Sequence, residues 1–403
     1  MLNLDEFFDF LYKLQVKTKG CKEIGLDSAL HRILYEDIIC KYNVPRFDNS
    51  AMDGYALRIG HKSYVIKDSI FAGNKVKINL KNNEAVKIMT GARIPKGAQA
   101  VIQKELTTLK DNNLFLDSTP QLNQSIKLKG EDFKKGEILL KKGALIDAQS
   151  IGILASQGID KVKVAKKVKI IIFGSGNEIA RLDSKLNENQ IYDINSYFLK
   201  SILSPLNCSI KYGGILDDNV DSISKSLQKA LKKYDIVITS GGVSVGDKDY
   251  IHKVLEKIDA KILVDSINIK PGRPMIFSNK DSKFILSLPG NPIGAFFHCM
   301  FCMSILIQKM SLSKDLYFKE INAINKTDFF VTNKTSHIVL GNFENGYFSA
   351  YNNAKYQGAQ IAPLMKSNSL AIFNNKDMVK KDSIIKIILY KPEFFDRIKN
   401  IFN

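Results

Sequence analysis

The sequence predicts a multidomain α/β protein with four parts: a doubly wound parallel-sheet domain, a β-rich insert domain, a linking α+β domain and a C-terminal β-barrel. Two observations lead to this fold class. Runs of β-branched residues alternate with amphipathic helical patterns over residues 167–313, as in a parallel sheet with helical crossovers. Short apolar runs between Gly, Asn and Pro turns fill residues 45–135 and 314–403, as in small β-domains. A chain of 403 residues has room for two to four domains at roughly 150 residues each.

We assign residues 1–44 and 136–166 to one linking domain, because the β-rich pattern of the insert ends near residue 135 and the chain then returns to this first domain. The first segment has helical apolar patterns over Phe7–Leu14 and Ser28–Leu34. The second predicts a hairpin over Gly136–Ile146 and an apolar helix over Ala148–Gly158, which a glycine ends.

Strands are predicted in the insert (45–135), the α/β domain (167–313) and the barrel (314–403). In the insert they cover Ser63–Lys67, Lys75–Leu80, Glu84–Met89, Ala100–Glu105 and Asn113–Asp117. In the α/β domain they cover Lys169–Phe173, Ser209–Gly213, Ile236–Thr239, Ile262–Ile267 and Phe284–Leu288, with helices starting at Ile194, Val220, Asp249 and Pro292. In the barrel they cover Ile338–Leu340, Tyr347–Tyr351, Leu370–Phe373 and Ser383–Leu389.

The charge balance is strongly basic, with 59 Lys and Arg against 41 Asp and Glu and a formal charge of +18. The lysines are spread along the chain, which favours a Lys-rich solvated surface over a single anion-binding patch. Nucleic-acid binding is the weaker alternative, because Trp is absent and no basic stripe with stacking aromatics is present. We therefore expect no nucleic-acid partner. The five scattered cysteines do not resemble a disulfide framework, so we expect a reducing, cytoplasmic environment.

The most apolar stretch, Ile293–Ile307, is shorter than the ~20 residues that a membrane span needs, and it follows a Pro-Gly-Asn-Pro break. It predicts a buried helix. Cys299 and Cys302 lie one turn apart in it and could share a metal, but core packing is favoured because no second ligand pair follows. The start Met1–Glu6 lacks the basic and apolar regions of a signal peptide, so we expect no membrane partner.

Three glycine-rich loops follow predicted strands of the α/β domain: residues 174–178, 240–249 and 289–292. Glycine lets the backbone approach a bulky anion, and the helix after each loop offers free N–H groups. The candidate ligand-binding residues are Ser175, Gly176, Ser240, Gly241, Gly242, Ser244, Gly246, Asp247, Pro289, Gly290, Asn291 and Pro292. Neither the Walker-A nor the dinucleotide-binding pattern is met, so the loops predict a different phosphate or nucleotide site, with simple structural turns as the alternative.

Charged residues gather at the same loops. The acids are Glu178, Asp217 with Asp218, and Asp247 with Asp249. Carboxylates repel a phosphate unless a hard cation bridges them, which favours Mg²⁺. Helix capping is the alternative for Asp218 and Asp249. Lys270 and Arg273, on a proline-stiffened loop, form a suitable clamp for a small anion.

Seven stretches together resemble one family. They are FDNSAMDGYAL (47–57), IMTGARIPKGAQAVIQKE (88–105), GEDF (130–133), QIYDINSY (190–197), DIVITSGGVSVGDKDY (235–250), KPGRP (270–274) and LPGNP (288–292). In this order they closely resemble the molybdopterin molybdenumtransferases, the MoeA and gephyrin E-domain family. The resemblance covers roughly residues 1–310, and the chain beyond Lys309 matches poorly.

The resemblance implies an elongated homodimer that takes adenylylated molybdopterin and molybdate, releases AMP and leaves molybdenum on the dithiolene with Mg²⁺ assistance. A molybdopterin adenylyltransferase would be the substrate donor, and the other partners would be small-molecule anions. The resemblance also assigns roles. Asp53 and Thr90 would enter the active cleft across the dimer, Asp132 would be the acid of the GED motif, and Lys270 and Arg273 would hold the anion. Glu178, Asp217 and Asp249 would surround the metal and the AMP phosphate, so the implied catalytic residues are Asp53, Thr90, Asp132, Glu178, Asp217, Asp249 and Lys270.

Four positions depart from the family pattern: Asn177, Ser266, His337 and Ala359. They leave open a molybdopterin-binding scaffold without turnover, or a paralogue tuned to another oxyanion such as tungstate. An adenylyltransferase is a further rival, but the motifs around Asp53 and Thr90 lie outside its single domain. We expect His337 to gain charge near pH 6.5 and replace a missing arginine, so that molybdate binding improves as the pH falls. The alternative is a surface His337 far from any ligand.

Overall fold

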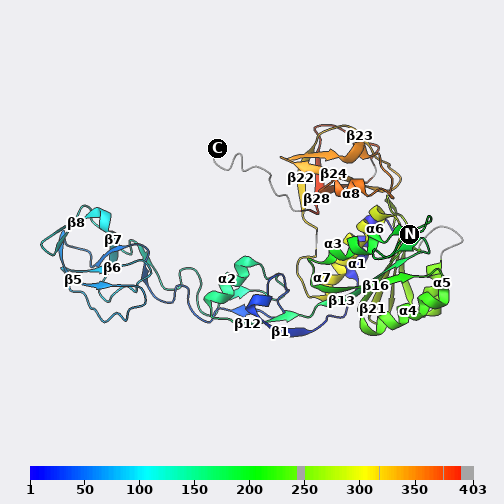
Figure 1. The fold of residues 1–403 in the computed structure, drawn as a ribbon. Helices are drawn as coiled ribbons and strands as arrows, with labels where there is room; N and C mark the ends of the chain where they lie inside the picture. The colour runs from blue at the N-terminus through cyan, green and yellow to red at the C-terminus, as the bar shows by residue number, and fades with distance from the viewer. Residues whose placement is uncertain (243–249, 317, 375, 392–403) are drawn as a thin grey trace.

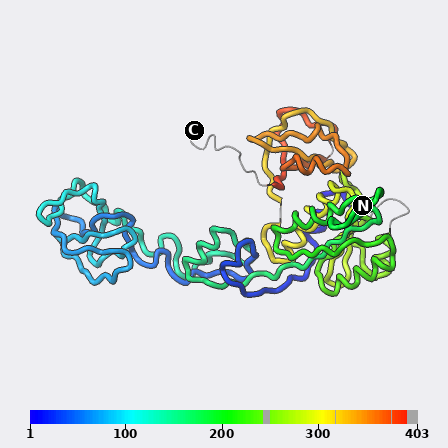
Figure 2. The backbone as a smooth tube through the Cα atoms, viewed as in Figure 1, coloured from blue at the N-terminus to red at the C-terminus, as the bar shows by residue number. Residues whose placement is uncertain are grey.

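The protein was analysed as a computed structural model that describes residues 1–242, 250–316, 318–374 and 376–391. The chain is elongated (Figures 1 and 2). A β-rich region forms one end, a small linking region lies in the middle, and an α/β region and a barrel stand together at the other end.

Helix α1 (Leu4–Lys13) is capped by Asn3, whose side chain accepts a hydrogen bond from the Glu6 N–H, while the Glu6 carboxylate accepts one from the Asn3 N–H. The sequence assigns this helix to the linking domain. In the structure its apolar face, Leu4, Phe7 and Leu11, packs into the main core of the α/β region instead.

The linking region is built from paired segments that are far apart in sequence. Strand β1 (Cys21–Gly25) pairs with β12 (Lys161–Ala165), and β2 (Ile38–Ile39) pairs with β11 (Ile138–Leu140). Helix α2 (Ala148–Ser156) confirms the helix predicted there.

Two local predictions in this region are wrong. Ser28–Leu34 is not a helix, because only a 3₁₀ turn forms at Leu26–Ser28 before Ile33 and Leu34 bridge to Leu145 and Val164. Gly136–Ile146 is not a hairpin for the same reason. Each segment pairs with a distant part of the chain instead of folding onto itself. These tertiary contacts override the local pattern.

The insert contains a six-stranded sheet in the order β7-β4-β6-β5-β9-β8. Its strands are β4 (Gly54–Leu57), β5 (Ser63–Ile70), β6 (Glu84–Ile88), β7 (Ala100–Gln103), β8 (Thr107–Lys110) and β9 (Asn113–Leu116). The short strands β3 (Asn49–Ser50) and β10 (Ile126–Lys127) pair separately. The strand predicted over Lys75–Leu80 is wrong: Val76, Ile78 and Leu80 pack against the insert core, but only one isolated bridge forms there.

The α/β region has a six-stranded sheet in the order β16-β13-β17-β21-β20-β18. Strands β13 (Val168–Ser175), β16 (Cys208–Leu216), β17 (Ile236–Ser240) and β21 (Lys283–Leu288) are parallel, which confirms the predicted core of the sheet. The sequence did not predict β20 (Ile276–Lys280), an antiparallel strand between β21 and β18 (Lys261–Asp265).

Helices cover both faces of this sheet. Helices α4 (Val220–Lys233) and α5 (Tyr250–Lys257) pack with one apolar cluster, and α3 (Ile194–Leu203) with α1 and α6 (Pro292–His298) packs with the other. Helix α6 continues through a π turn, η3 (Cys299–Met303), into α7 (Ser304–Met310). The whole helix Pro292–Met310 is long and apolar enough to cross a membrane, but 83% of its apolar window is buried inside the protein.

The buried helix Pro292–Met310 therefore matches the prediction of a core element. Cys299 and Cys302 lie in its buried part, and burial raises the pKa of both thiols. Within the described ranges, no group of three or more His, Cys, Asp and Glu side chains could hold a metal. Core packing explains these two cysteines.

The C-terminal region closes into a barrel, as predicted. Its strands are β22 (Glu320–Asn325), β24 (Ser336–Glu344), β25 (Tyr347–Ala350), β26 (Ser369–Phe373) and β28 (Ile384–Leu389), and β26 pairs back with β24 to close the ring. Strand β19 (Ile269–Lys270) leaves the α/β region and pairs with β24. This pairing attaches the barrel directly to the loop that carries Lys270.

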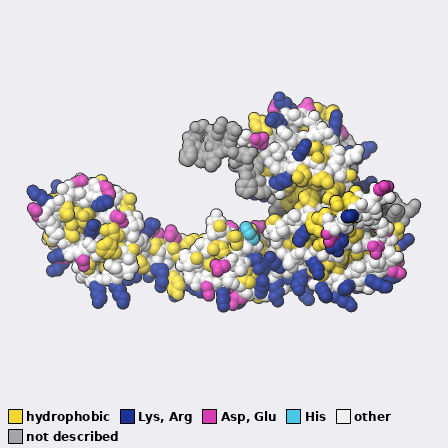
Figure 3. All heavy atoms as spheres, in the orientation of Figure 1, with side chains coloured by type: hydrophobic (Ala, Val, Ile, Leu, Met, Phe, Trp, Pro, Cys, Tyr) yellow, Lys and Arg dark blue, Asp and Glu magenta, His cyan; other side chains and the backbone are white. Residues whose placement is uncertain are grey.

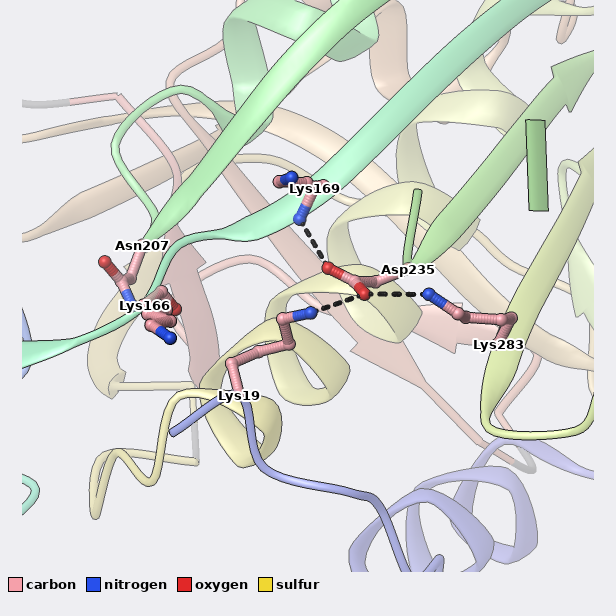
Figure 4. A network of polar contacts seen from close by, with 6 residues as sticks. All are labelled: Lys19, Lys166, Lys169, Asn207, Asp235 and Lys283. Atoms are coloured by element: carbon pink, nitrogen blue, oxygen red, sulfur yellow. Dashed lines mark hydrogen bonds and ion pairs between the residues drawn. The ribbon is translucent and has the colours of Figure 1, made fainter. Parts of the chain in front are cut away.

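Asp235, at the start of β17, joins three segments of the chain (Figure 4). Its carboxylate accepts hydrogen bonds from Lys19 Nζ at 2.6 Å, the Lys169 backbone N–H at 2.8 Å and Lys283 Nζ at 3.2 Å. Burial alone would raise the pKa of Asp235, but these donors together outweigh it and hold the pKa below its ordinary value.

We expect Asp235→Asn to lower the free energy of unfolding at pH 7 by about 2 kcal/mol, because two half-buried lysines lose their charged partner. The pKa is depressed in the folded state, so the stabilisation is complete above 3.8 and disappears as the pH falls through the folded pKa. Urea unfolding at pH 7 and at a pH below the folded pKa of Asp235 measures this. Asp183→Asn, which breaks an exposed pair with Arg181, is the control. An equal loss at both pH values would contradict the assignment.

Candidate active site

Three strands of the α/β sheet end beside a common cavity of about 300 Å³. Strand β13 contributes Gly174 and Ser175, β17 contributes Ser240, and the turn after β21 contributes Gly290 and Asn291. The ladder is parallel, with Gly174 opposite Ser240 and Ser240 opposite Leu288. The three loops therefore start at the same edge of the sheet, where such folds bind their ligands. Of the predicted site residues, the structure brings Ser175, Glu178, Ser240, Gly290, Asn291 and Pro292 together in this cavity.

Two loop positions favour glycine, Gly241 because the loop backbones approach closely and both Gly241 and Gly176 because of their backbone conformation. A Cβ atom on Gly241 would lie 2.2 Å from the Ser175 carbonyl oxygen, and one on Gly176 would lie 2.6 Å from the Glu178 carboxylate oxygens. Both have positive φ, +107° and +130°. Ser175 Oγ is buried and has no hydrogen-bond partner among the described residues.

Asn195, which the sequence analysis did not select, ties two of the loops together. Its Nδ2 donates to Ser240 Oγ and to the Gly290 carbonyl, both at 2.8 Å. Asn195 lies in the first turn of α3, where Asp193 caps the helix by accepting from the Ser196 N–H at 3.0 Å. The sequence signal was present, because both residues fall in the QIYDINSY stretch after the first loop.

The turn after β21 leads directly into helix α6. Asn291 caps it by accepting from the Gly294 N–H at 2.7 Å, and Pro292 occupies its first turn. Because Asn291 and Pro292 line the cavity, the positive end of this helix faces the space where an anion would lie.

The Lys270–Pro274 loop packs against the same helix. A Cβ on Gly272 would lie 2.6 Å from Gly294 Cα, and the buried His298 ring hydrogen-bonds the Gly272 carbonyl through Nε2. Lys270 and Arg273 are exposed beside this contact, and Arg273 Nε donates to Met1 Sδ at 3.1 Å. Neither cation is among the described residues that line the cavity.

The acids of the predicted site are only partly brought together. Glu178 lines the cavity, and Asp217 is exposed at the start of the neighbouring loop. Asp218 Oδ2 accepts from the Asn177 N–H at 3.4 Å. It does not cap α4, because Asn219 is the N-cap, so the capping alternative for Asp218 is wrong. Ser244, Gly246, Asp247 and Asp249 lie outside the described residues.

Asp53 and Thr90 belong to the insert, which stands at the opposite end of the elongated molecule from the α/β region (Figure 1). The Asp53 carboxylate accepts from the Thr90 N–H at 2.7 Å and from its hydroxyl at 2.8 Å. These two hydrogen bonds, with smaller help from Lys104 and Lys87, lower the pKa of Asp53. Asp132 is exposed between the insert and the linking region. One chain therefore does not bring these three residues to the cavity.

Comparison with known proteins places the chain in a family. Residues 2–158 match the family model of the MoeA N-terminal region (domain I and II), and residues 171–308 match a probable molybdopterin binding domain. A molybdopterin molybdenumtransferase of Haemophilus influenzae is 40% identical over 319 residues, 78% of this chain and 79% of that protein. One from Staphylococcus epidermidis is 30% identical over 347 residues, 84% and 83% of the two chains.

The chain belongs to the molybdopterin molybdenumtransferase family. Its members are enzymes of molybdenum cofactor biosynthesis. The crystal structure of the molybdopterin biosynthesis MoeA protein from Pyrococcus horikoshii OT3 superposes with a TM-score of 0.83 and 27% identity, covering 97% of this chain and 100% of that one. The fold of this chain therefore follows that of its relative beyond residue 310, where the sequence motifs end.

The four positions that depart from the resemblance all lie near the cavity or the Lys270 loop. Ala359 lines the cavity and offers it only a methyl group. Asn177 presents its backbone N–H to Asp218. Ser266 adopts a positive φ of 67° and donates its N–H to the Met275 carbonyl at 2.8 Å, which makes it part of the turn before the Lys270 loop.

His337 differs from both expectations. It is 7% exposed and lies opposite Lys270 in the β19–β24 ladder, so it is not a remote surface residue. Its Nδ1 accepts from the Thr332 N–H at 3.1 Å. Burial, and then the Lys270 charge, lowers the pKa of His337 to about 4. The expectation that it gains charge near pH 6.5 is therefore wrong.

We expect the His337 ring to titrate at about 4 in an NMR titration, with the signal assigned by its loss in His337→Gln. At pH values between about 4 and 6.5, the His337 imidazole is protonated in the unfolded chain and neutral in the folded chain. Stability therefore falls as the pH drops through 6.5, and His337→Gln reduces this slope. A titration near 6.5 would contradict the buried, neutral assignment.

Proposed function

We propose that this molybdenumtransferase transfers molybdenum from molybdate to adenylylated molybdopterin and releases AMP, acting in the cytoplasm on substrate from a molybdopterin adenylyltransferase. The observation that carries the proposal is the cavity where three loops meet at one sheet edge, joined by Asn195. Ser175 Oγ and Asn195 Oδ1 are buried there without partners among the described residues. Buried polar atoms usually have partners, so a polar ligand is the simplest explanation.

The described residues supply the binding side of this chemistry. Backbone N–H groups of the glycine loops and of the α6 N-terminus favour phosphate oxygens. Lys270 and Arg273, next to the Gly272–Gly294 contact, provide cations for the oxyanion and for negative charge that develops during transfer. His337 stays neutral, so it adds no charge beside Lys270.

Glu178 and Asp217 provide the oxygen ligands that Mg²⁺ prefers. They lie in the loops after β13 and β16, and these loops are joined by the hydrogen bond from the Gly176 N–H to the Leu216 carbonyl at 3.3 Å. We therefore assign them, with Asp249 beyond the described residues, as the groups that would hold Mg²⁺. A bound ion there would supply Lewis-acid polarisation of a phosphoryl oxygen.

Asp53 and Thr90 enter this scheme only if a second chain supplies them. Within one chain the insert and the α/β region, whose strand ends form the cavity, stand at opposite ends of the molecule (Figure 1). We therefore propose a homodimer in which the insert of one chain completes the cavity of its partner, with Asp53, Thr90 and Asp132 contributed in this way.

A second candidate is a molybdopterin-binding protein without turnover, or one that uses tungstate. The observation that favours it is the lack of oxyanion donors at two positions: Ala359 offers a methyl group and His337 stays uncharged.

Molybdate-dependent release of AMP from adenylylated molybdopterin tests the proposed reaction. We expect the wild-type chain to release AMP and Glu178→Gln to lose at least about 100-fold in rate, because a group that acts on the transition state is removed. Glu344→Gln, an exposed acid in the barrel, is the matched control and should retain full activity. Binding of molybdopterin without AMP release would support the scaffold, and release with tungstate alone would support the paralogue.

A mixing experiment tests the shared cavity. Asp53→Ala and Glu178→Ala chains should each be inactive alone. Subunit exchange should restore about a quarter of the wild-type rate, because half of the random dimers then carry one intact site. The same mixture made with Glu178→Ala and Glu178→Gln should stay inactive. No recovery in exchanged Asp53→Ala and Glu178→Ala dimers would place both residues in the site of a single chain.

A further inference from the structure

A groove runs along the outer edge of the α/β sheet, between strand β16 and helix α4. Two cavities of about 550 and about 330 Å³ form it, and Lys211, Lys233 and Tyr234 line both. Lys169 and Ser209 line the larger one, near the starts of β13 and β16. The candidate active site lies at the opposite ends of these strands, so the groove is separate from it.

Lysines make this groove strongly positive. Its lining includes Lys169, Lys211, Lys229, Lys232 and Lys233, and no carboxylate side chain. Within the described ranges none of these five ammonium groups forms an ion pair. The nearby Asp235 does not compensate them, because Lys19 and Lys283 already pair with it. Figure 3 shows Lys and Arg side chains crowded along the lower edge of this part of the molecule. We call this feature the basic groove.

The floor of the basic groove is an unpaired strand edge. Strand β16 is the last strand of the six-stranded sheet, and in the described part of the chain it pairs only with β13. The residues from Ser209 to Gly213 on this strand line the cavities. An exposed edge offers backbone N–H and C=O groups to another extended chain.

We propose that the basic groove binds an extended acidic segment of another protein, which adds to β16 as a further strand. The strand edge supplies main-chain hydrogen bonds, and the flanking lysines select carboxylates on the added segment. This recognition is independent of the proposed reaction, because it uses none of the residues around the active-site cavity.

Two other occupants fit the basic groove less well. A second copy of the chain on a two-fold axis would place the same lysines against each other, which is unfavourable. Single-stranded nucleic acid needs exposed rings on which bases can stack. The tyrosines in the groove, Tyr212 and Tyr234, are half-buried, and no arginine lines it.

The test uses the full chain and a fluorescent peptide of about ten residues in which Glu alternates with Val. We expect saturable binding by fluorescence anisotropy, and K211E/K232E/K233E should weaken it by at least about tenfold. The control variant K75E/K77E/K110E replaces three exposed lysines of the insert and changes the net charge by the same amount. Its affinity for the peptide should stay within about twofold of wild type. Thermal unfolding followed by circular dichroism checks that both variants remain folded.

If both triple variants weaken peptide binding equally, only the net charge of the protein matters, and the proposal that the basic groove is the binding site is wrong. Methylation of alternate backbone nitrogens of the peptide should also weaken binding, because it removes the main-chain donors. If this peptide binds unchanged, strand addition is wrong. An oligothymidylate of about ten nucleotides that binds more tightly than the peptide, and loses binding in K211E/K232E/K233E, would assign the groove to nucleic acid instead. All these outcomes are independent of AMP release, so they do not depend on the proposed reaction.

Discussion

The parallel register of β13, β17 and β21 is the constraint on which the site depends. Gly174 lies opposite Ser240, and Ser240 lies opposite Leu288. A shift of one residue in either ladder would turn the side chains to the other face of the sheet. The buried residues on both faces, such as Ile172 and Val237, prevent such a shift. The apolar core thus holds three polar loops at the same level, and one amide, Asn195, is enough to join two of them.

The barrel is held to this site by contacts rather than by chain connection alone. Strand β19 pairs with β24, and the Ile293 N–H donates to the Gly358 carbonyl at 3.2 Å. The loop that follows β19 packs against α6 through Gly272 and Gly294. The barrel residue Ala359 consequently reaches the cavity. Small residues are needed at these points because larger side chains would separate the loop, the helix and the barrel.

The sequence was sufficient for the parallel core, the barrel and most strand positions, because these follow from apolar patterns that are local in the chain. The sequence pattern did not predict structure correctly where a segment pairs with another segment that is far away in the chain. The apolar residues over Ser28–Leu34 fit a helix, yet Ile33 and Leu34 pair with Leu145 and Val164. The loops of the site were predictable from their glycines, whereas Asn195 was not selected because its role depends on which loops meet. The neutrality of His337 depends on burial and on Lys270 across the ladder, and a sequence pattern shows neither.

The insert is connected to the rest of the chain by two segments that run side by side. Val44 and Phe133 form a bridge, and the Asp132 N–H donates to the Val44 carbonyl at 3.0 Å. A single connecting segment would allow the insert to turn about its axis. Two segments joined in this way resist such twisting, while bending across their common plane is less restricted. The insert is therefore carried on a double-stranded stalk that resists twisting, and the length and direction of this stalk determine how far from its own cavity it presents Asp53.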